Sequence, residues 1–148
     1  MNLSSLIELA LKSEEVVELL EHYEIPVVYD FDRLNENTPD IYWASSPKDG
    51  FELRFNEEQV LVAIFMHVVP DGTFSAIDPN LVGAPLYGTF TEAKTAFETD
   101  GITFRTSADG EGWIKGNFKD YSVHYQFGPS GALCLVTVGV ADAFHARA

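Results

Sequence analysis

The chain has 148 residues, which is the size of one ordinary domain, and 46% of them are hydrophobic and 13% aromatic. This composition supports a hydrophobic core and excludes intrinsic disorder as the reason for the charge. The net charge of −14, from 23 acidic and 9 basic residues, argues against nucleic-acid binding and against an anionic membrane surface as a partner.

The acidic residues are concentrated in the first part of the chain. Residues 1–58 hold 14 acidic and 4 basic residues, a net charge of −10, whereas residues 59–148 hold 9 and 5, a net charge of −4. Such a charge speeds the encounter with a basic protein partner. The alternative is a solvated surface that keeps the protein soluble. Both interpretations remain open at this point.

A single cysteine, Cys134, excludes an internal disulfide, and its apolar neighbours predict a buried, inert thiol. The N-terminus lacks the basic region and the continuous apolar stretch of a signal peptide. The longest apolar run, residues 60–69, is too short to span a bilayer. We therefore expect a cytoplasmic protein.

Residues 1–24 are predicted to be helical, because apolar side chains recur there at helical spacing. Ser13 is followed by two glutamates, which is typical of a helix N-cap with acidic residues in the first turn. We therefore expect two short helices, or one helix kinked near Ser13. A proline at position 26 ends the pattern, and residues 27–40 are predicted to be a loop.

Residues 41–77 predict a β-meander. The segment 51–55 alternates apolar and polar residues, as a half-buried strand does, and it follows a Pro-Lys-Asp-Gly turn. A second turn follows it and leads into an apolar strand. The predicted strands of this part are 41–45, 51–55, 60–68 and 74–77.

A short helix is predicted over residues 91–99, capped by Thr91 and ended by Gly101. Residues 102–140 predict further strands, and residues 141–148 a frayed tail. No internal repeat is apparent. Tight turns between strands favour antiparallel pairing, so the expected fold is one α+β domain with a mainly antiparallel sheet. The predicted strands of this part are 102–106, 113–118, 121–127 and 133–140.

The sequence contains no recognisable catalytic motif. It has no P-loop and no Gly-x-Ser-x-Gly elbow, and none of its four histidines is paired with a second histidine or cysteine at metal-ligand spacing. We therefore expect a binding protein without a cofactor or metal, rather than an enzyme. The alternative is a small-ligand-binding or enzymatic domain with a cleft near His124 and Trp113, in which His124 acts as a general base.

Acidic residues flanked by aromatic residues are the candidate partner-binding site. The helical spacing of three glutamates in residues 14–21 places them on one exposed face. The acidic residues of segment 30–40 lack the spacing of a Ca²⁺ loop, which makes pairing with lysines and arginines of a partner the better interpretation. Nearby aromatic residues suit interface anchors. The predicted partner-binding residues are Glu14, Glu18, Glu21, Asp30, Asp32, Glu36, Asp40, Tyr29, Phe31 and Trp43.

The stretch from residue 50 to residue 140 resembles the small immunity proteins that accompany bacterial toxins such as pyocins and contact-dependent inhibition effectors. The resemblance is carried by Gly-Phe-Glu-Leu-Arg-Phe at 50–55, the acidic turn at 56–58 and Leu-Val-Ala-Ile-Phe at 61–65. A Leu-x-Gly-x-Pro connection at 81–85, a short helix and closing strands follow. The resemblance implies a protein that inhibits a cognate toxin, and an acidic surface suits a basic toxin domain.

Three functions are therefore expected, in this order. The first is an immunity-type inhibitor that binds a basic protein. The second is the ligand-binding or enzymatic domain near His124. The third is a structural or self-assembling protein, which a large apolar patch on an edge strand would support.

Overall fold

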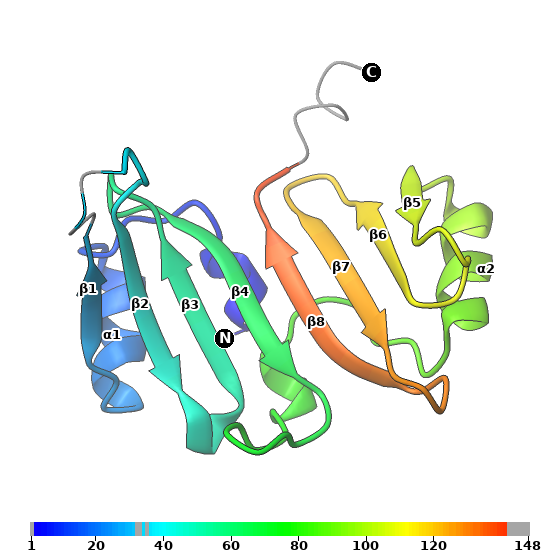
Figure 1. The fold of residues 1–148 in the computed structure, drawn as a ribbon, viewed down its shortest axis with the longest axis horizontal. Coiled ribbons are helices and arrows are strands. Elements are labelled where there is room, and N and C mark those ends of the chain that lie inside the picture. The colour runs from blue at the N-terminus through cyan, green and yellow to red at the C-terminus, as the bar shows by residue number, and fades with distance from the viewer. Residues whose placement is uncertain (1, 32–33, 35, 142–148) are drawn as a thin grey trace.

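A computed structural model describes residues 2–31, 34 and 36–141 of the chain. Eight strands form a single antiparallel sheet in the order β1-β2-β3-β4-β8-β7-β6-β5 (Figure 1). This confirms an α+β fold with a mainly antiparallel sheet. The strands are β1 (Val27–Asp30), β2 (Ile41–Ser46), β3 (Phe51–Phe55), β4 (Leu61–His67), β5 (Phe104–Thr106), β6 (Trp113–Asn117), β7 (Ser122–Phe127) and β8 (Leu133–Gly139).

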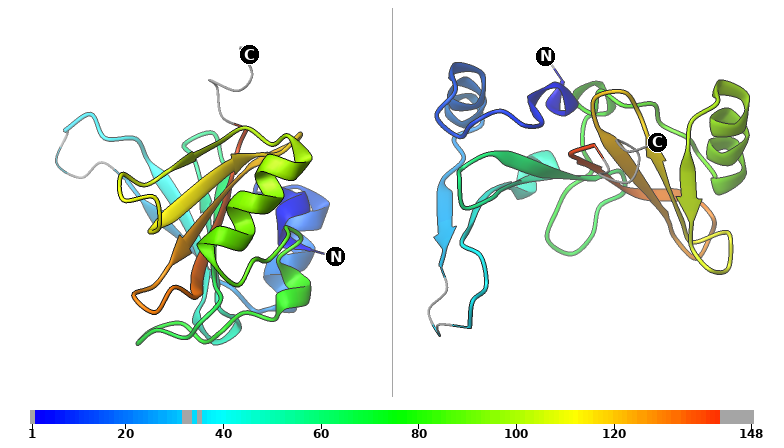
Figure 2. Two further views of the ribbon diagram at one scale, coloured as in Figure 1. Left: turned by 90° about the vertical axis from the view of Figure 1, so that its right-hand side faces the viewer. Right: turned by 90° about the horizontal axis from the view of Figure 1, so that it is seen from above.

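The two α-helices are α1 (Glu14–His22) and α2 (Phe90–Asp100), and three short 3-10 helices accompany them: η1 (Leu3–Leu6), η2 (Pro47–Asp49) and η3 (Pro79–Leu81). Both α-helices lie on the same face of the sheet, one near each end (Figure 2). The opposite face carries no helix; we call it the open face. The β5–β6 turn and the β7–β8 turn project from the sheet on the side of the open face, away from the helices (Figure 2).

The hydrophobic core lies between the sheet and the helices. Val16 and Leu19 of α1 and Ala93 and Phe97 of α2 are buried against it. The strands contribute every second residue, as the two-residue side-chain period of a strand requires. Their buried apolar residues include Phe51, Leu53, Phe55, Ile64, Met66, Ile114, Val123, Tyr125, Phe127, Val136 and Val138.

The N-terminal region contains less helix than its apolar spacing predicts. Residues 7–13 form turns between η1 and α1, with one isolated bridge in which Ala10 pairs with Val60. Their backbone pairs with the β3–β4 connection: Leu61 N donates to Leu9 O at 2.9 Å, and Leu11 N donates to Gln59 O at 2.7 Å. Ser13 makes no capping bond to the helix and instead donates its hydroxyl to Ala10 O at 2.7 Å. Two helical elements are therefore present, but tertiary hydrogen bonds replace the helix between them.

Two predictions about the strands are wrong. β1 lies in the segment 27–40, which was predicted to be a loop. The turn-forming Pro, Asn and Asp residues that flank its four residues hide the strand pattern in the sequence. The segment 74–77 is not a strand. Its backbone binds a turn and a strand end instead, with Ser75 N donating to Pro47 O at 2.8 Å and Ile77 N donating to His67 O at 2.7 Å.

The helix α2 begins earlier than predicted. Thr89, rather than Thr91, is its N-cap, since the Thr89 hydroxyl accepts a hydrogen bond from Glu92 N at 3.3 Å. Gly101 ends the helix in the left-handed conformation, with a φ of 69°. The predicted tail at 142–148 lies outside the described residues.

The sheet consists of two equivalent halves. In each half one α-helix precedes a four-stranded meander: α1 precedes β1–β4, and α2 precedes β5–β8. The halves meet where β4 pairs with β8, from Ala63 opposite Gly139 to His67 opposite Leu135. The arrangement has the form of an internal duplication about an axis through this central pair.

The duplication extends to irregular features. Each half has a register shift at the same place, between Arg54 and Phe55 in β3 and between Gln126 and Phe127 in β7. The two shifts are 72 residues apart (127 − 55 = 72). Each connection that follows contains a left-handed residue, Gln59 with a φ of 64° in one half and Gly131 with a φ of 85° in the other. The sequence conceals this repeat because the equivalent residues differ.

The helix α2 packs so closely on β6 that a methyl group has no room between them. A Cβ atom on Gly116 would lie 2.8 Å from Cε2 of Phe97. The Phe97 ring cannot move aside easily, since the rings of Tyr87, Phe104 and Phe118 contact it with centroids 5.7–5.9 Å away. A substitution of Gly116 therefore tests how closely α2 packs on β6.

We expect Gly116→Ala to lower the free energy of unfolding by about 1–3 kcal/mol, the usual cost of overpacking a core. Chemical denaturation followed by circular dichroism measures it. The control is Gly72→Ala, where no atom lies within 4 Å of the added Cβ, and it should change stability by less than about 0.5 kcal/mol. Equal effects of the two substitutions would contradict the packing argument.

Candidate functional site

The edge strand β1 exposes all four of its residues. Val28 is 59% exposed and Tyr29 45%, and Phe31, just beyond the strand, is 46% exposed. Within the part of the chain that the structure describes, β1 pairs on one side alone, with β2, from Val27 opposite Ala44 to Asp30 opposite Ile41. We call the outer surface of β1 and α1 the β1 end. It combines a free strand edge with exposed apolar side chains.

A stack of three aromatic rings gives the β1 end its shape. The Tyr29 ring lies between those of Tyr42 and Phe31, with centroid distances of 4.8 and 5.5 Å. The Tyr29 hydroxyl donates to the Asp40 carboxylate at 2.6 Å. That hydrogen bond is the main reason that the pKa of Tyr29 is raised to about 12. Tyr29 is therefore a neutral, oriented aromatic group beside a carboxylate.

The helix α1 adds an acidic, partly apolar groove to the same end. Val17, Leu20, Glu21 and Glu24 line it, together with Ile25 and the following proline, around a volume of about 460 Å³. α1 lies behind β1 and β2 (Figures 1 and 2), so the groove and the exposed edge belong to one end of the molecule. Between residues 13 and 47 the sequence has nine acidic residues and one basic residue.

The structure brings together some of the predicted partner-binding residues and separates others. Glu14, Glu18 and Glu21 are exposed on α1 as predicted, and Tyr29 and Phe31 stack beside Asp40. Two further acidic residues are exposed nearby: Asp30 at the end of β1, and Glu36 in the connection between β1 and β2. Asp32 lies outside the described residues.

Trp43 does not belong to the aromatic stack. It points to the open face, where its ring lies 6.1 Å from that of Phe65 and the Arg54 guanidinium lies 5.9 Å from its centroid. Adjacent residues of a strand face opposite sides, so Tyr42 and Trp43 cannot serve one site. Tyr42 is one of the aromatic residues near the acidic segment but was not among the predicted partner-binding residues. Sequence analysis missed Val27 and Val28; this β-branched pair before Tyr29 was the available signal for an edge strand.

Glu18 also borders a pocket away from the β1 end. This pocket has a volume of about 370 Å³ and lies among α1, η1 and η3. Leu3, Leu19 and Leu81 give it an apolar floor and wall, and His22 and Tyr23 complete it. Burial is the main cause of the raised pKa of Tyr23, followed by the charges of Asp49 and Asp78.

The open face carries the histidine that the sequence singled out. The His124 ring is half-buried and stacks on Trp113 with centroids 5.1 Å apart, and Lys115 is its neighbour across the β6–β7 pair. Burial, and then the charge of Lys115, lower the pKa of His124. Among the described residues, the charge that shifts the pKa of this imidazole is that of an ammonium group, rather than that of the carboxylate that would orient a general base.

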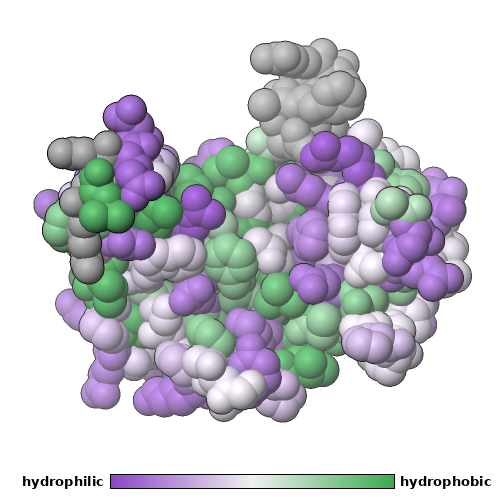
Figure 3. Space-filling model, in the orientation of Figure 1, coloured by the Kyte–Doolittle hydropathy of each residue, from purple (hydrophilic) through white to green (hydrophobic). Residues whose placement is uncertain are grey.

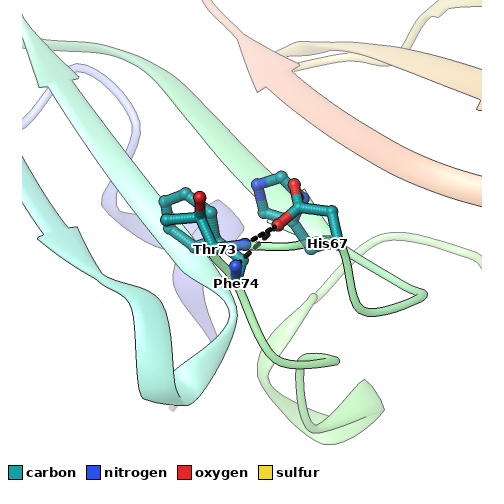
Figure 4. A network of polar contacts seen from close by, with 4 residues as sticks. His67, Thr73 and Phe74 are labelled. Carbon is teal, nitrogen blue, oxygen red and sulfur yellow. Dashed lines mark hydrogen bonds and ion pairs between the residues drawn. The ribbon is translucent and has the colours of Figure 1, made fainter.

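His67 holds the loop that follows β4. Its ring stacks on Phe74 with centroids 4.3 Å apart, and its Nδ1 lies 3.4 Å from the Asp71 carboxylate (Figure 4). Backbone N–H groups of Phe74 and Thr73 donate to that carboxylate at 2.6 and 2.7 Å and hold the pKa of Asp71 below its usual range. This cluster fixes the loop at the rim of the open face.

Cys134 is half-buried rather than fully buried. Its thiol donates to Gln126 O at 3.2 Å, and burial raises the pKa of the thiol. A raised pKa leaves little thiolate at neutral pH, so the thiol is a poor nucleophile.

Comparison with known proteins gave no matching family model, no matching curated protein and no matching solved structure. Within residues 2–31, 34 and 36–141, no three His, Cys, Asp or Glu side chains are grouped closely enough to hold a metal ion. The same part of the chain has no helix long and apolar enough to cross a membrane. The site must therefore be interpreted from its own geometry.

The lowered pKa of His124 makes stability depend on pH. The unfolded chain takes up a proton near pH 6.5, whereas folded His124 resists protonation, so stability falls as the pH drops through that value. We expect His124→Gln to reduce the loss of unfolding free energy between pH 7.5 and 5.5. Each unit by which the pKa is lowered corresponds to about 1.4 kcal/mol. Denaturant titrations at several pH values measure this, and an unchanged pH dependence would contradict it.

Proposed function

We propose that this chain is a binding protein of the immunity type, which inhibits a basic bacterial toxin domain by docking it on the β1 end. The observation that carries the proposal is the exposed apolar edge of β1 within an acidic surface. In this proposal the protein acts in the bacterial cytoplasm, needs no cofactor and has no catalytic activity.

Exposed apolar side chains on a free strand edge favour association. Val28 exposes more than half of its surface to water, and Tyr29 nearly half. β1 is also an edge strand, so the N–H and C=O groups on its outer side are not paired with another strand of the described sheet. Such edges pair readily with other chains unless they are covered or charged. A partner that covers β1 would remove apolar surface from water, at about 25 cal/mol per Å² before the costs of association.

The surrounding charge selects the kind of partner. Glu21 and Glu24 line the groove of α1, and Asp40 lies beside the aromatic stack. A basic partner would be drawn towards this end before contact, which increases the association rate more than the final affinity. Aromatic side chains bordered by charge are typical anchors of protein interfaces.

The exposed edge of β1 also supports the self-assembling alternative. Two copies that meet at β1 would bring two acidic surfaces together, so added salt would strengthen their association. A basic partner would instead be held less tightly as salt rises. The direction of the salt dependence therefore separates the two functions.

The test uses the product of the gene adjacent to that of this protein, coexpressed and copurified with it. We expect a complex of the two proteins, rescue of growth from the toxicity of the partner, and an affinity that falls as NaCl rises from 50 to 500 mM. Failure to bind at low salt, or binding that salt strengthens, would reject the proposal.

Substitution at the β1 end gives the matched mutational test. We expect Tyr29→Ser to weaken the complex by at least tenfold, about 1.4 kcal/mol, because it removes the central ring of the stack. Glu21→Lys should mainly slow association. The control is Glu98→Lys on α2, an exposed acidic residue at the opposite end of the sheet, which should change the affinity by less than twofold. Surface plasmon resonance gives both rates.

A further inference from the structure

The open face differs in charge from the rest of the molecule. The strands β2–β8 contain three Lys or Arg residues, Arg54, Arg105 and Lys115, and one acidic residue, Glu52. Their net charge is +2, so the remainder of the chain carries −16, since the total is −14. The strand alternation places all four side chains on the open face. The basic residues of the strands are therefore gathered on one face, whereas the β5–β6 turn on the same side carries Asp109 and Glu111.

Aromatic and apolar side chains share this face with the cations. Trp43 lies beside Arg54, and Trp113 stacks on His124 in the row that contains Lys115. Phe65 lies between them at the centre of the sheet, opposite Thr137 of β8. Figure 3 shows the open face, where hydrophobic patches lie among hydrophilic ones. The face is thus neither a plain solvated surface nor a purely apolar one.

Arg54 is held in an unusual state. Its Nε atom is buried, and it has no hydrogen-bond partner among the residues that the structure describes. A buried guanidinium donor without an acceptor costs free energy. A carboxylate that draws the Arg54 guanidinium outward from its position over Trp43 would pair with it and recover that cost. Glu52, two residues before Arg54 on β3, accepts a hydrogen bond from the hydroxyl of Ser45 on β2.

We infer that the open face is a second docking surface, which binds an acidic polypeptide segment with apolar or aromatic side chains at its centre. The carboxylates of the segment would meet Arg54 at one end and Lys115 and Arg105 at the other. Lys115 lies four strands from Arg54, about 19 Å at the usual strand spacing, and Arg105 lies one strand further. The apolar centre of the segment would cover Phe65 and Trp113.

A polypeptide fits this surface better than a nucleic acid. Phosphate binding needs a continuous basic track, whereas the open face has two separate basic positions on a chain whose remainder carries −16. A segment with two or three carboxylates experiences much less of this repulsion. The surface is distinct from the β1 end, so the inference holds or fails independently of the proposed function.

Random 16-residue peptides displayed on phage supply the probe. Peptides are selected on the intact protein alone, and each recovered peptide is then tested on the Arg105→Glu/Lys115→Glu variant. We expect the recovered peptides to be acidic with aromatic residues at the centre. In fluorescence titrations the double reversal should weaken their binding at least tenfold. Arg105→Gln/Lys115→Gln should weaken it less, and the variant Lys48→Glu/Lys94→Glu, which has the same change in charge, by less than twofold.

Intrinsic fluorescence reports the location of binding. Both tryptophans of the chain, Trp43 and Trp113, lie on the open face, so a docked peptide should shift their emission. Circular dichroism shows whether each variant is folded. If the Arg105→Glu/Lys115→Glu variant does not fold, the Arg105→Gln/Lys115→Gln variant takes its place. Recovery of neutral or basic peptides, or of none, would overturn the inference. The inference would also be overturned, in favour of nucleic acid, if an 18-nucleotide oligo-dT bound more tightly than the selected peptides and the Arg105→Glu/Lys115→Glu variant lost that binding.

Discussion

The pairing of β4 with β8 is the interaction on which the rest of the structure depends. Five residue pairs, from Ala63 opposite Gly139 to His67 opposite Leu135, join two meanders that otherwise contact their own helices. Without this ladder each half would expose a central strand, which is a costly free edge. Because it is antiparallel, the ladder also relates the two halves as equivalent units. One sheet face is therefore covered by two helices, and the other face extends unbroken across both halves.

Two opposed surfaces result from this construction. The helices cover the apolar side of the sheet. Their outer faces carry acidic residues, such as Glu14, Glu18 and Glu21 of α1. The basic strand residues lie on the other side, where no helix covers them. The net charge of −14 is thus an average over two unlike surfaces. The two proposed docking surfaces therefore differ in the charge of the partner that each would attract.

The fold class and most elements followed from the sequence, because alternation and turn residues act locally. The alternation of residues 51–55 and the face shared by Val123, Tyr125 and Phe127 are both present in the structure. The segment 7–13 could not be predicted, since its conformation depends on distant partners such as Leu61. Nor could the two basic positions of the open face, because the distance between Arg54 and Lys115 depends on the strand order, which the sequence leaves open. The candidate site was predicted as acidic segments, but the separation of Trp43 from Tyr29 needed the register of β1 and β2.

The two edges of the sheet are unequal, and this limits how copies of the chain can assemble. β1 is a four-residue edge with exposed apolar side chains, whereas β5 has three residues and α2 lies alongside it (Figure 2). Antiparallel contact between two β1 strands is isologous, so each copy uses the same edge and a twofold axis closes the pair. Growth into a filament needs a second edge, and β5, with three residues, offers a shorter one than β1. The asymmetry therefore favours closed dimers over filaments when copies assemble edge to edge through β1.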